Sequence, residues 1–579
     1  MMENREIARI FHEIADILEI QDANPFRVRS YRRAAQVVES LAFEAAGALA
    51  SEPDRIRSLP GIGGGTFQKI QELVQTGRCK EHEELLDQVP ETLLTLLELQ
   101  NLGPKKIALF WKELKIGTIE QLEEAARNHR LQSLPGMGAK SEEKILKAVQ
   151  DYRGRQGRFR IDFVDESSER LIRYLKKRVD VDRISTAGSL RRRRETIGDL
   201  DLLVTCRNPE DAMEKFVQYD EVREVLARGE TKATVVMKSS MQVDLRVLEP
   251  ESFGAALQYF TGSKEHNVAL REMAKKKGFK INEYGLFAIE SGKRVAGREE
   301  SEIYRHLGLP PIPTELRENR GEIERAEAGD LPKLIELDDL RGDLHMHTTA
   351  SDGQNTVQEM AEAASRRGYE YMAVTDHSKS LAMIGGLDEK RLRKEIEHID
   401  EIRKKDPGIE ILKGIEVDIL ADGQLDLSDE ALKELDVVIA SIHSRFSLSR
   451  KEMTLRICRA LENPAVNILA HPTGRLILKR EAYEVDLEQV VAAAVENRVC
   501  LEVNAYPARL DLNDVHVRMA RDMGALISIN SDSHHTEMLR YVSYGVDTAR
   551  RGWLEKEDVI NTFPLSRLRK ILRKESYRE

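Results

Sequence analysis

The stretch 188–204, GSLRRRRETIGDLDLLV, decides the fold of its surroundings. It predicts a strand, a loop and a second strand in which Asp199 and Asp201 alternate with leucines and so share one face. Two adjacent carboxylates raise each other's pKa, and such a pair normally binds a divalent cation. A third carboxylate, Asp244, stands in another alternating stretch, MQVDLR at 241–246. Three carboxylates on neighbouring strands can hold two metal ions for phosphoryl transfer.

The loop before this aspartate pair offers backbone N–H, hydroxyl and guanidinium donors, which a triphosphate needs. A D-x-D motif alone fits a solvated edge strand equally well, but that reading does not explain the loop or Asp244. The whole arrangement resembles the nucleotidyltransferase core of the family X DNA polymerases, the group of polymerase beta. The resemblance implies that two magnesium or manganese ions are held by Asp199, Asp201 and Asp244. It also implies contacts to the triphosphate from Gly188, Ser189 and Arg192.

Length and charge narrow the class of protein. A chain of 579 residues is too long for one core, and several domains are expected. With 90 basic and 100 acidic residues, its net charge of −10 excludes indiscriminate coating of nucleic acid and predicts local basic patches. Four dispersed cysteines without a C-x-x-C pair indicate no disulfide framework. Since the sequence shows neither a signal peptide nor a membrane-length apolar run, we expect no membrane contact and a cytoplasmic location.

The sequence predicts two helical regions, residues 1–85 and 86–152. Similar glycine-containing motifs recur in them: LPGIG at 59–63, LGPKKI at 102–107 and LPGMGAK at 134–140. Glycines permit a tight hairpin and leave N–H groups free at the start of the next helix, where phosphate can bind without a base being read. The repeats resemble the helix-hairpin-helix elements of DNA repair proteins. That resemblance implies DNA contacts from Gly61, Gly63, Gly103, Lys105, Gly136 and Gly138. Whether the third hairpin binds DNA or only supports the fold is left open.

Lys69 stands eight residues after Gly61. In the family's lyase enzymes the Schiff-base lysine has this spacing, which implies a 5′-deoxyribose phosphate lyase. An amine whose pKa is depressed by neighbouring cations could attack the aldehyde of an abasic sugar. The alternative, that Lys69 is one more phosphate contact, is equally compatible with the sequence.

The expected palm (153–258) is followed by an expected thumb (259–316) that opens with YFTGS at 259–263. A buried aromatic pair is normally packing, but the string resembles the polymerase beta thumb. The resemblance implies that Tyr259 and Phe260, before the Gly262 turn, exclude a 2′-hydroxyl. It implies a minor-groove contact from Asn267 and a template contact from Arg271. Val268 departs from the pattern, because polymerase beta has a lysine there that stacks on the templating base.

The proline-rich run LPPIP at 309–313 leads into a strongly charged stretch that we expect to be a linker able to carry a short helix (317–340). The region 341–579 then repeats a different pattern. Histidines and carboxylates end apolar runs, beginning with DLHMH at 343–347, and amphipathic helices separate them. This order predicts a (β/α) barrel with its chemistry at the carboxyl ends of the strands. Mixed histidine and carboxylate ligands suit zinc, manganese or iron and phosphoester hydrolysis.

This region resembles the PHP (polymerase and histidinol phosphatase) domain, which implies up to three metal ions. The implied first site consists of His345, His347, Glu416 and Asp532. The second consists of Glu416, His443 and His471, and the third of Asp352, His377 and His534. Many relatives have a histidine at the position of Asp352, while His516 and His535 are expected to be non-ligands.

The sequence as a whole is identified as a member of the bacterial or archaeal family X DNA polymerases. The resemblance implies a monomer that fills short gaps in gapped or primer–template DNA with deoxynucleoside triphosphates, in base excision repair. It implies a manganese-dependent 3′–5′ exonuclease in the PHP domain, with abasic-site endonuclease or 3′-phosphatase action as further options. The alternatives are a nucleotidyltransferase for RNA or small molecules, a PHP phosphatase for a small phosphomonoester, and a DNA-binding scaffold without catalysis.

Overall fold

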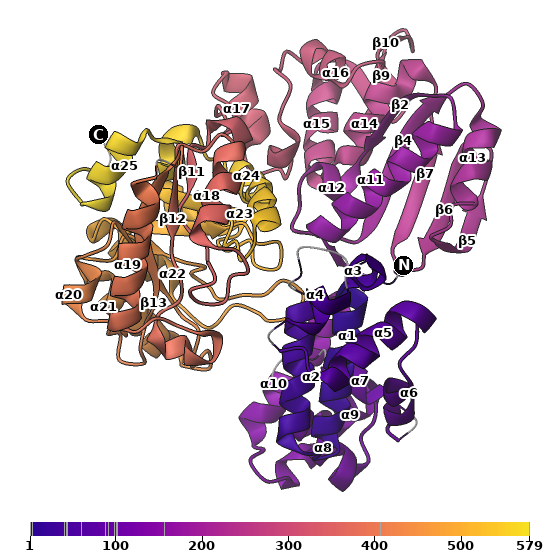
Figure 1. The fold of residues 1–579 in the computed structure, drawn as a ribbon. Helices are drawn as coiled ribbons and strands as arrows, with labels where there is room; N and C mark the ends of the chain where they lie inside the picture. Colours follow the sequence, from indigo (N-terminus) through magenta and orange to yellow (C-terminus); the bar gives the residue numbers. More distant parts are fainter. Residues whose placement is uncertain are drawn as a thin grey trace. The chain divides into compact units, whose positions relative to one another are not determined.

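The chain forms two compact units, residues 1–156 and 157–579 (Figure 1). The computed structural model describes every residue except 1, 3, 40, 42–44, 52, 60, 87, 91, 98, 100, 101, 156, 406, 578 and 579. Among the residues described, no helix has the length and apolar character needed to cross a membrane.

The first unit is helical, as the apolar spacing of residues 7–18 indicates. Its helices are α1 (Asn4–Ile20), α2 (Pro25–Glu39), α3 (Ala45–Ser51), α4 (Pro53–Arg57), α5 (Gly64–Thr76), α6 (Lys80–Leu86), α7 (Thr92–Leu97), α8 (Pro104–Leu114), α9 (Ile119–Arg127) and α10 (Ala139–Arg155). One continuous core runs through them, in which Phe11 and Ile14 of α1, Ile70 of α5 and Phe110 of α8 are fully buried. Neither hairpin region could fold alone without exposing part of this core.

Tight turns precede α5, α8 and α10, as the glycine repeats predict. The amide of Ile62 donates to the carbonyl of Leu59 at 3.0 Å, and Met137 repeats this contact with Leu134 at 3.1 Å. Gly61 has a φ of 105°, a conformation that favours glycine. These turns confirm the helix-hairpin-helix prediction.

The palm is built on a five-stranded mixed sheet of order β2-β4-β7-β6-β5. Its elements are β1 (Phe159–Arg160), α11 (Ile161–Arg178), β2 (Val181–Thr186), α12 (Gly188–Arg191), β3 (Thr196–Ile197), β4 (Asp199–Cys206), α13 (Pro209–Val217), β5 (Val222–Arg228), β6 (Lys232–Met237) and β7 (Gln242–Val247). Leu171 of α11 and Phe216 of α13 share one core with Leu200 and Leu202 of β4. The leucines of the D-x-D strand therefore face the core, and its aspartates face the other way.

The thumb follows with α14 (Phe253–Thr261), α15 (Lys264–Lys276), the antiparallel strands β8 (Phe279–Asn282), β9 (Gly285–Ala288) and β10 (Arg294–Ala296), and α16 (Glu300–His306). The segment expected to be a linker carries a short helix, α17 (Glu322–Ala328). It is packed rather than extended, because Ile323, Ala326 and Leu334 join the core of the thumb. Arg317, at the start of this segment, is only 2% exposed.

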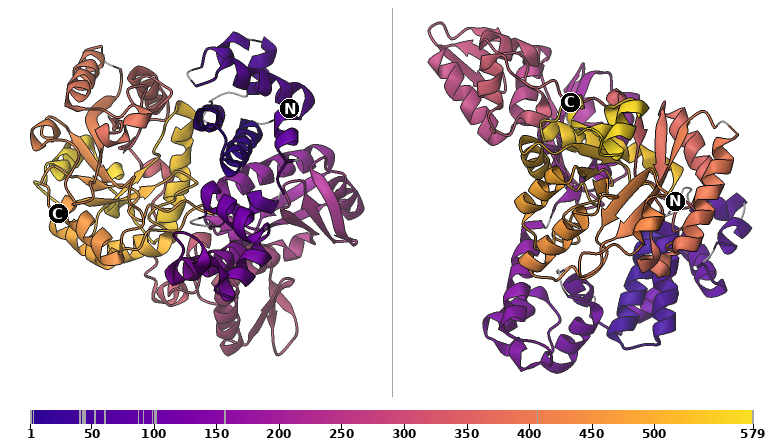
Figure 2. Two further views of the ribbon diagram at one scale, coloured as in Figure 1. Left: turned by 90° about the horizontal axis from the view of Figure 1, so that it is seen from below. Right: turned by 90° about the vertical axis from the view of Figure 1, so that its left-hand side faces the viewer.

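The third part of the second unit is a parallel barrel (Figures 1 and 2). Its seven strands follow chain order: β11 (Gly342–Asp343), β12 (Tyr371–Val374), β13 (Glu410–Asp418), β14 (Val437–Ser441), β15 (Ile468–Leu469), β16 (Cys500–Asn504) and β17 (Ile527–Asn530). A parallel bridge between Met346 and Ser533 joins the two ends of the sheet, and the amide of His347 donates to the carbonyl of Ser533 at 2.8 Å. The barrel prediction is therefore confirmed.

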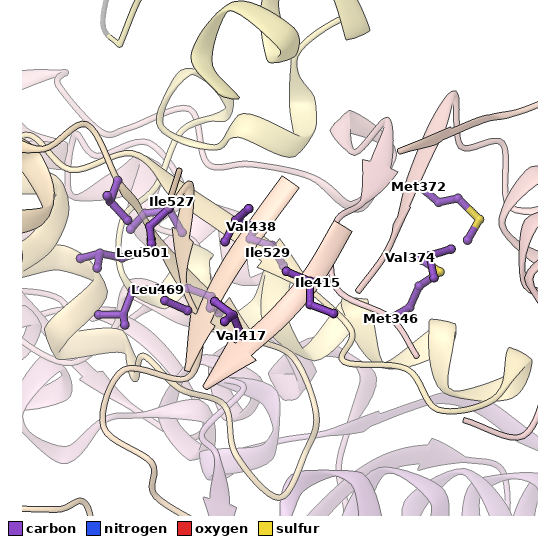
Figure 3. Close-up of a cluster of buried hydrophobic side chains, with 14 of the residues drawn as sticks. Met346, Met372, Val374, Ile415, Val417, Val438, Leu469, Leu501, Ile527 and Ile529 are labelled. Atoms are coloured by element: carbon purple, nitrogen blue, oxygen red, sulfur yellow. The ribbon is translucent and has the colours of Figure 1, made fainter. Parts of the chain in front are cut away.

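The barrel's helices are α18 (Val357–Arg366), α19 (Glu389–Arg403), α20 (Asp429–Leu432), α21 (Arg450–Leu461), α22 (Leu487–Glu496), α23 (Asp514–Asp522), α24 (Val542–Arg551) and α25 (Leu565–Leu572). In β12 to β16, neighbouring residues enter two different apolar clusters. Figure 3 shows the first, which includes Val438, Leu469 and Leu501 of the adjacent strands β14, β15 and β16. The second includes Leu412 of β13 and Leu568 of α25, so the last helix completes the barrel's core.

Candidate active sites

The three palm aspartates lie on adjacent parallel strands. Asp201 of β4 stands in register with Asp244 of β7, and Asp199 stands two residues earlier on the same strand. Gly188, at the start of α12, has a φ of 61°, and a Cβ atom there would lie 2.8 Å from Asp201 Oδ2. Glycine is needed at this position because the loop closes directly onto a carboxylate. The structure thus brings the predicted triad and the predicted triphosphate loop together.

The electrostatics of this triad favour cation binding. Burial, followed by the charges of Asp199 and Asp244, raises the pKa of Asp201 to about 6. Asp244 is held by two residues that sequence reasoning missed: Thr234 Oγ1 donates to its Oδ1 at 2.7 Å, and Lys232 Nζ lies 3.0 Å from its Oδ2. Carboxylates crowded so that one resists ionisation fit magnesium or manganese ions, which take oxygen ligands.

Arg192 follows α12 and extends toward the thumb. Its Nε lies 3.1 Å from Glu318 Oε1, and its Nη1 donates to the carbonyl of Thr261. A Cβ atom at Gly262 would lie 3.0 Å from Arg192 Nη1, so the glycine turn also permits this approach. Glu318 was not expected in this site, and nothing in its sequence context marks it.

The thumb residues occupy one end of α14 and the start of α15. The rings of Tyr259 and Phe260 meet edge to face at 5.1 Å, and the guanidinium of Arg246 lies 4.3 Å from the centre of the Phe260 ring. Asn267 is 8% exposed, and its Nδ2 donates to the carbonyl of Tyr259 at 2.7 Å. The Asn267 side chain thereby anchors the aromatic turn.

Two further thumb residues lie along α15. Arg271 Nε donates to the carbonyl of Asn267 at 3.1 Å. Val268, which departs from the polymerase beta pattern, is 41% exposed. The nucleotide and template roles of these thumb residues stay predictions.

The nine predicted PHP ligands converge at the carboxyl ends of the barrel strands. Three groups have ligand atoms within 4.8 Å of one another: His347, Asp352, His377 and His534; His345, His347 and Asp532; and His377, Glu416 and His443. His471 joins them through its Nε2, 3.0 Å from Glu416 Oε1. These groups share members across the three implied sites, so the assignment of ligands to individual ions stays a prediction.

Unpaired polar atoms show that this cluster fits metal ions. Among the residues that the structure describes, His345 Nε2 and His347 Nδ1 are buried without a hydrogen-bond partner. His377 Nδ1 lies 2.8 Å from Glu416 Oε2, and both atoms are buried at the centre of the cluster. Burial, reinforced by the charges of His534 and His377, lowers the pKa of His347 to about 4. Burial acts the same way on His345, His377 and His534, but neighbouring carboxylates outweigh it and raise the pKa of each. Neutral imidazoles and an ionised carboxylate are the forms that bind metal, and leaving such atoms unmatched is costly.

Sequence reasoning missed the residues that orient these ligands. Glu502 is fully buried on β16; its Oε1 lies 2.7 Å from His345 Nδ1, and its Oε2 accepts from the amide of His471 at 2.8 Å. Asp418 Oδ1 accepts from the amide of His443 at 3.1 Å. A carboxylate on the second nitrogen of a ligating histidine fixes its tautomer. The available signal was an acidic residue inside the apolar strand CLEVN.

In the first unit, Lys69 Nζ lies 2.7 Å from Glu81 Oε2, and its ammonium lies 5.8 Å from the centre of the Tyr31 ring. This contact with a carboxylate differs from the expected cluster of cations. The hairpin positions Gly63, Gly103, Lys105, Gly136 and Gly138 are exposed, and Gly61 is half-buried.

Four family models match the chain in the order that its folds suggest. They describe a helix-hairpin-helix domain at residues 2–79, a SAM-like helix-hairpin-helix tandem at 93–151, a DNA polymerase beta thumb at 256–318 and a PHP domain at 343–506. The palm between the second and third matches carries the three aspartates. Together these regions define the class: a family X DNA polymerase that carries a PHP domain.

A full-length comparison narrows that class. The DNA polymerase/3′-5′ exonuclease PolX of Bacillus subtilis is 41% identical over 579 residues, which cover 99% of this chain and 100% of that protein. The chain therefore belongs to the PolX family. Its barrel is also similar to smaller proteins: a probable phosphatase of Acetivibrio thermocellus is 34% identical over 204 residues, 33% of this chain and 78% of its own length.

Proposed function

We propose that the palm of this PolX protein fills short gaps in DNA and that its PHP centre removes nucleotides from the 3′ end. The separation of two metal-ligating clusters within one unit carries this proposal. One consists of carboxylates on β4 and β7, and the other of histidines and carboxylates inside the barrel. We place the activity in the cytoplasm, in a monomer that acts in base excision repair.

In the palm, Asp199, Asp201 and Asp244 hold two magnesium or manganese ions, which supply charge stabilisation for displacement at the α-phosphate when bound. Lys232 and Thr234 fix Asp244 beside the position of the primer 3′-hydroxyl. Ser189 and Arg192 orient the triphosphate, and the Tyr259–Phe260 pair limits space at the sugar. The contacts that hold Asp244 and Arg192 exist without substrate, which supports a lower entropic cost for the reaction.

In the PHP centre, the nine ligands hold manganese, zinc or iron, which supply Lewis-acid chemistry for phosphodiester hydrolysis when bound. Glu502 fixes His345 and the backbone of His471, so both imidazoles point to one place. The side chains of His443 and His534 are 15% and 27% exposed, while those of His345 and His347 are fully buried. A 3′ end therefore approaches from the side of His443 and His534.

A gap-filling assay tests the polymerase. On a one-nucleotide gap, we expect incorporation of one deoxynucleotide and discrimination against the matching ribonucleotide. Ribonucleotide use at equal efficiency would contradict the assignment and favour an RNA or small-molecule nucleotidyltransferase.

The similarity to probable phosphatases supports a second candidate for the PHP centre, hydrolysis of a small phosphomonoester. We expect a kcat/KM for a DNA 3′ end that exceeds the value for histidinol phosphate. The reverse order would assign the barrel to small-molecule chemistry. A DNA substrate with a 3′-phosphate or an abasic site separates exonuclease from 3′-phosphatase and endonuclease action.

We further propose a 5′-deoxyribose phosphate lyase that uses Lys69. The hairpin before α5 would receive the 5′ phosphate, and the Lys69 amine would attack the sugar aldehyde to form a Schiff base with loss of water. Glu81, whose Oε2 lies 2.7 Å from Lys69 Nζ, would hold the lysine side chain in place. Borohydride should trap an adduct with the wild-type chain and with Lys105→Ala, but not with Lys69→Ala. An equal yield from Lys69→Ala would discard the lyase and leave Lys69 as a phosphate contact.

A further inference from the structure

Two nearby residues of the triphosphate loop, Arg193 and Glu195, form ion pairs with the PHP domain. Arg193 Nε lies 2.7 Å from Asp547 Oδ2 of α24, while its two amino groups bind Asp165 of the palm, each at 2.8 Å. Glu195 accepts two hydrogen bonds from Arg475, at 3.0 and 2.6 Å, from the loop that follows β15. A loop of the palm therefore derives its conformation from a different domain.

The contact that matters most for the nucleotide is made by Arg551, the last residue of α24. Its Nη1 donates to the carbonyl of Arg192 at 2.7 Å and lies 3.1 Å from Glu318 Oε1. Its Nη2 donates to Asp514 Oδ2 at 2.7 Å. The same Glu318 oxygen accepts from Arg192 Nε at 3.1 Å. One carboxylate oxygen is thus shared between an arginine of the palm and an arginine of the PHP domain.

We infer that Arg551 is a positioning residue for nucleotide binding in the palm, acting through the Arg192 carbonyl and through Glu318. The inference rests on the proposed role of Arg192 as a triphosphate contact. It assigns to the PHP domain a part in polymerisation that is separate from its own hydrolytic centre.

Burial makes this arrangement effective. The side chain of Arg551 is 4% exposed and that of Glu318 is 10% exposed. Charged hydrogen bonds are stronger in such surroundings, and removing one partner leaves the others buried and uncompensated. Burial opposes the charge of Glu318, but Arg192 and Arg551 outweigh it and lower the pKa of its carboxyl.

Loss of Arg551 has a defined local consequence. The Arg192 carbonyl loses a donor, and Glu318 is left with fewer cations to satisfy it. The carboxylate is then free to turn both oxygens onto Arg192, which draws the guanidinium away from the incoming triphosphate. Ground-state binding of the nucleotide weakens more than the chemical step, because the aspartates on β4 and β7 are unchanged.

Steady-state gap filling with the full chain tests this inference. For Arg551→Ala we expect the KM for the deoxynucleoside triphosphate to rise about tenfold, the size of one lost charged hydrogen bond, with kcat nearly unchanged. Exonuclease activity of the same preparation should match wild type and reports that the variant has folded. Should Arg551→Ala fail to fold, Arg551→Lys keeps the charge but cannot bridge three acceptors, and we expect an intermediate KM.

Two further variants separate the causes. Arg540→Ala is the matched control, because Arg540 also joins the PHP domain to the palm, through Glu166 at 3.0 Å, without touching the triphosphate loop. It should leave KM unchanged, and an equal rise in both variants would overturn the inference in favour of general domain adhesion. Arg192→Ala should raise KM at least as much as Arg551→Ala. If Arg192→Ala raises KM and neither Arg551 variant does, only the inference is overturned; if Arg192→Ala has no effect, the assigned role of Arg192 fails with it.

Discussion

The palm and the PHP barrel each gather side chains that could hold metal ions, but they do so in opposite ways. The palm uses three carboxylates from two adjacent strands, and Asp199 remains exposed. The barrel gathers nine ligands at the carboxyl ends of its strands; most are histidines, and six of the nine are buried. An open, oxygen-only site suits magnesium or manganese and a large substrate. An enclosed mixed site accepts manganese, zinc or iron, so its metal depends more on availability.

The largest expected effect comes from a substitution that inactivates the palm site and leaves the PHP site intact. Asp244→Ala removes a carboxylate that two neighbours hold in place, and we expect gap filling to fall by at least about 100- to 1,000-fold. Primer shortening by the PHP centre should keep its wild-type rate, because none of its ligands touches β7. Loss of both activities in a folded variant would show that the sites are not independent.

A second variant tests whether the enclosed site depends on the residues around its ligands. Glu502→Gln keeps the shape of the side chain but weakens its bond to His345 Nδ1. We expect exonuclease activity to fall about 10- to 100-fold, with gap filling unchanged. Glu410→Gln, on β13 and paired with Arg569, is the matched control. Equal activity of the two variants would contradict the positioning role.

The third prediction concerns how the carboxylates of the palm site lower the free energy of unfolding when no metal is bound. Because the pKa of Asp201 is raised to about 6 from 3.8, the folded chain binds this proton more tightly than the unfolded chain. Its ionisation therefore reduces stability as pH rises from 3.8 to 6, and the loss persists above pH 6. Without metal, Asp201→Asn should raise the unfolding free energy of the second unit by about 1–3 kcal/mol at pH 7.5 and by less at pH 5.

Thermal unfolding in a metal chelator measures this difference. A stabilisation of equal size at both pH values would contradict the account, since it would not follow the ionisation of Asp201. With added magnesium, the wild-type chain should become more stable than Asp201→Asn. Only the wild-type chain retains all three carboxylates to bind the ion, and ion binding stabilises the folded state.

The smallest effect concerns the polymerase side alone. Val268 is 41% exposed on α15, where the polymerase beta pattern has a lysine that stacks on the template. Val268→Lys should raise the affinity for gapped DNA by about two- to fivefold at low salt, and less at high salt. Val268→Leu should change neither. If the affinity for DNA rises but does not depend on salt concentration, the gain would come from packing rather than from the added charge.

Local patterns predicted much of both sites. The alternation around Asp199 and Asp201 determines which face the carboxylates occupy, and the apolar runs before His345, His377 and His443 predict where parallel strands end. Both patterns are short-range and reflect the side-chain period of a strand. The glycine repeats were equally local, since Gly61 and Gly136 have the positive φ that their own turns require.

Contacts between distant segments could not be predicted in this way. Glu318 and Arg551 are separated by 233 positions, and only the packing of thumb, palm and barrel brings them together. Glu81 reaches Lys69 because α6 returns beside α5, and this reversed the expected electrostatic surroundings of the lysine. Glu502 was missed because the other residues of its strand have the apolar pattern of a buried core strand. Ion pairs of this kind depend on tertiary arrangement rather than on residue spacing.

The central claim is that one chain holds two independent metal-dependent activities. A 5′-labelled primer on a one-nucleotide gap, with manganese and nucleotides, can be followed for wild type, Asp199→Ala/Asp201→Ala and His345→Ala/His347→Ala. We predict that the aspartate variant only shortens the primer and that the histidine variant only extends it. Continued shortening by a folded histidine variant would show that the barrel is not the nuclease and would contradict the account.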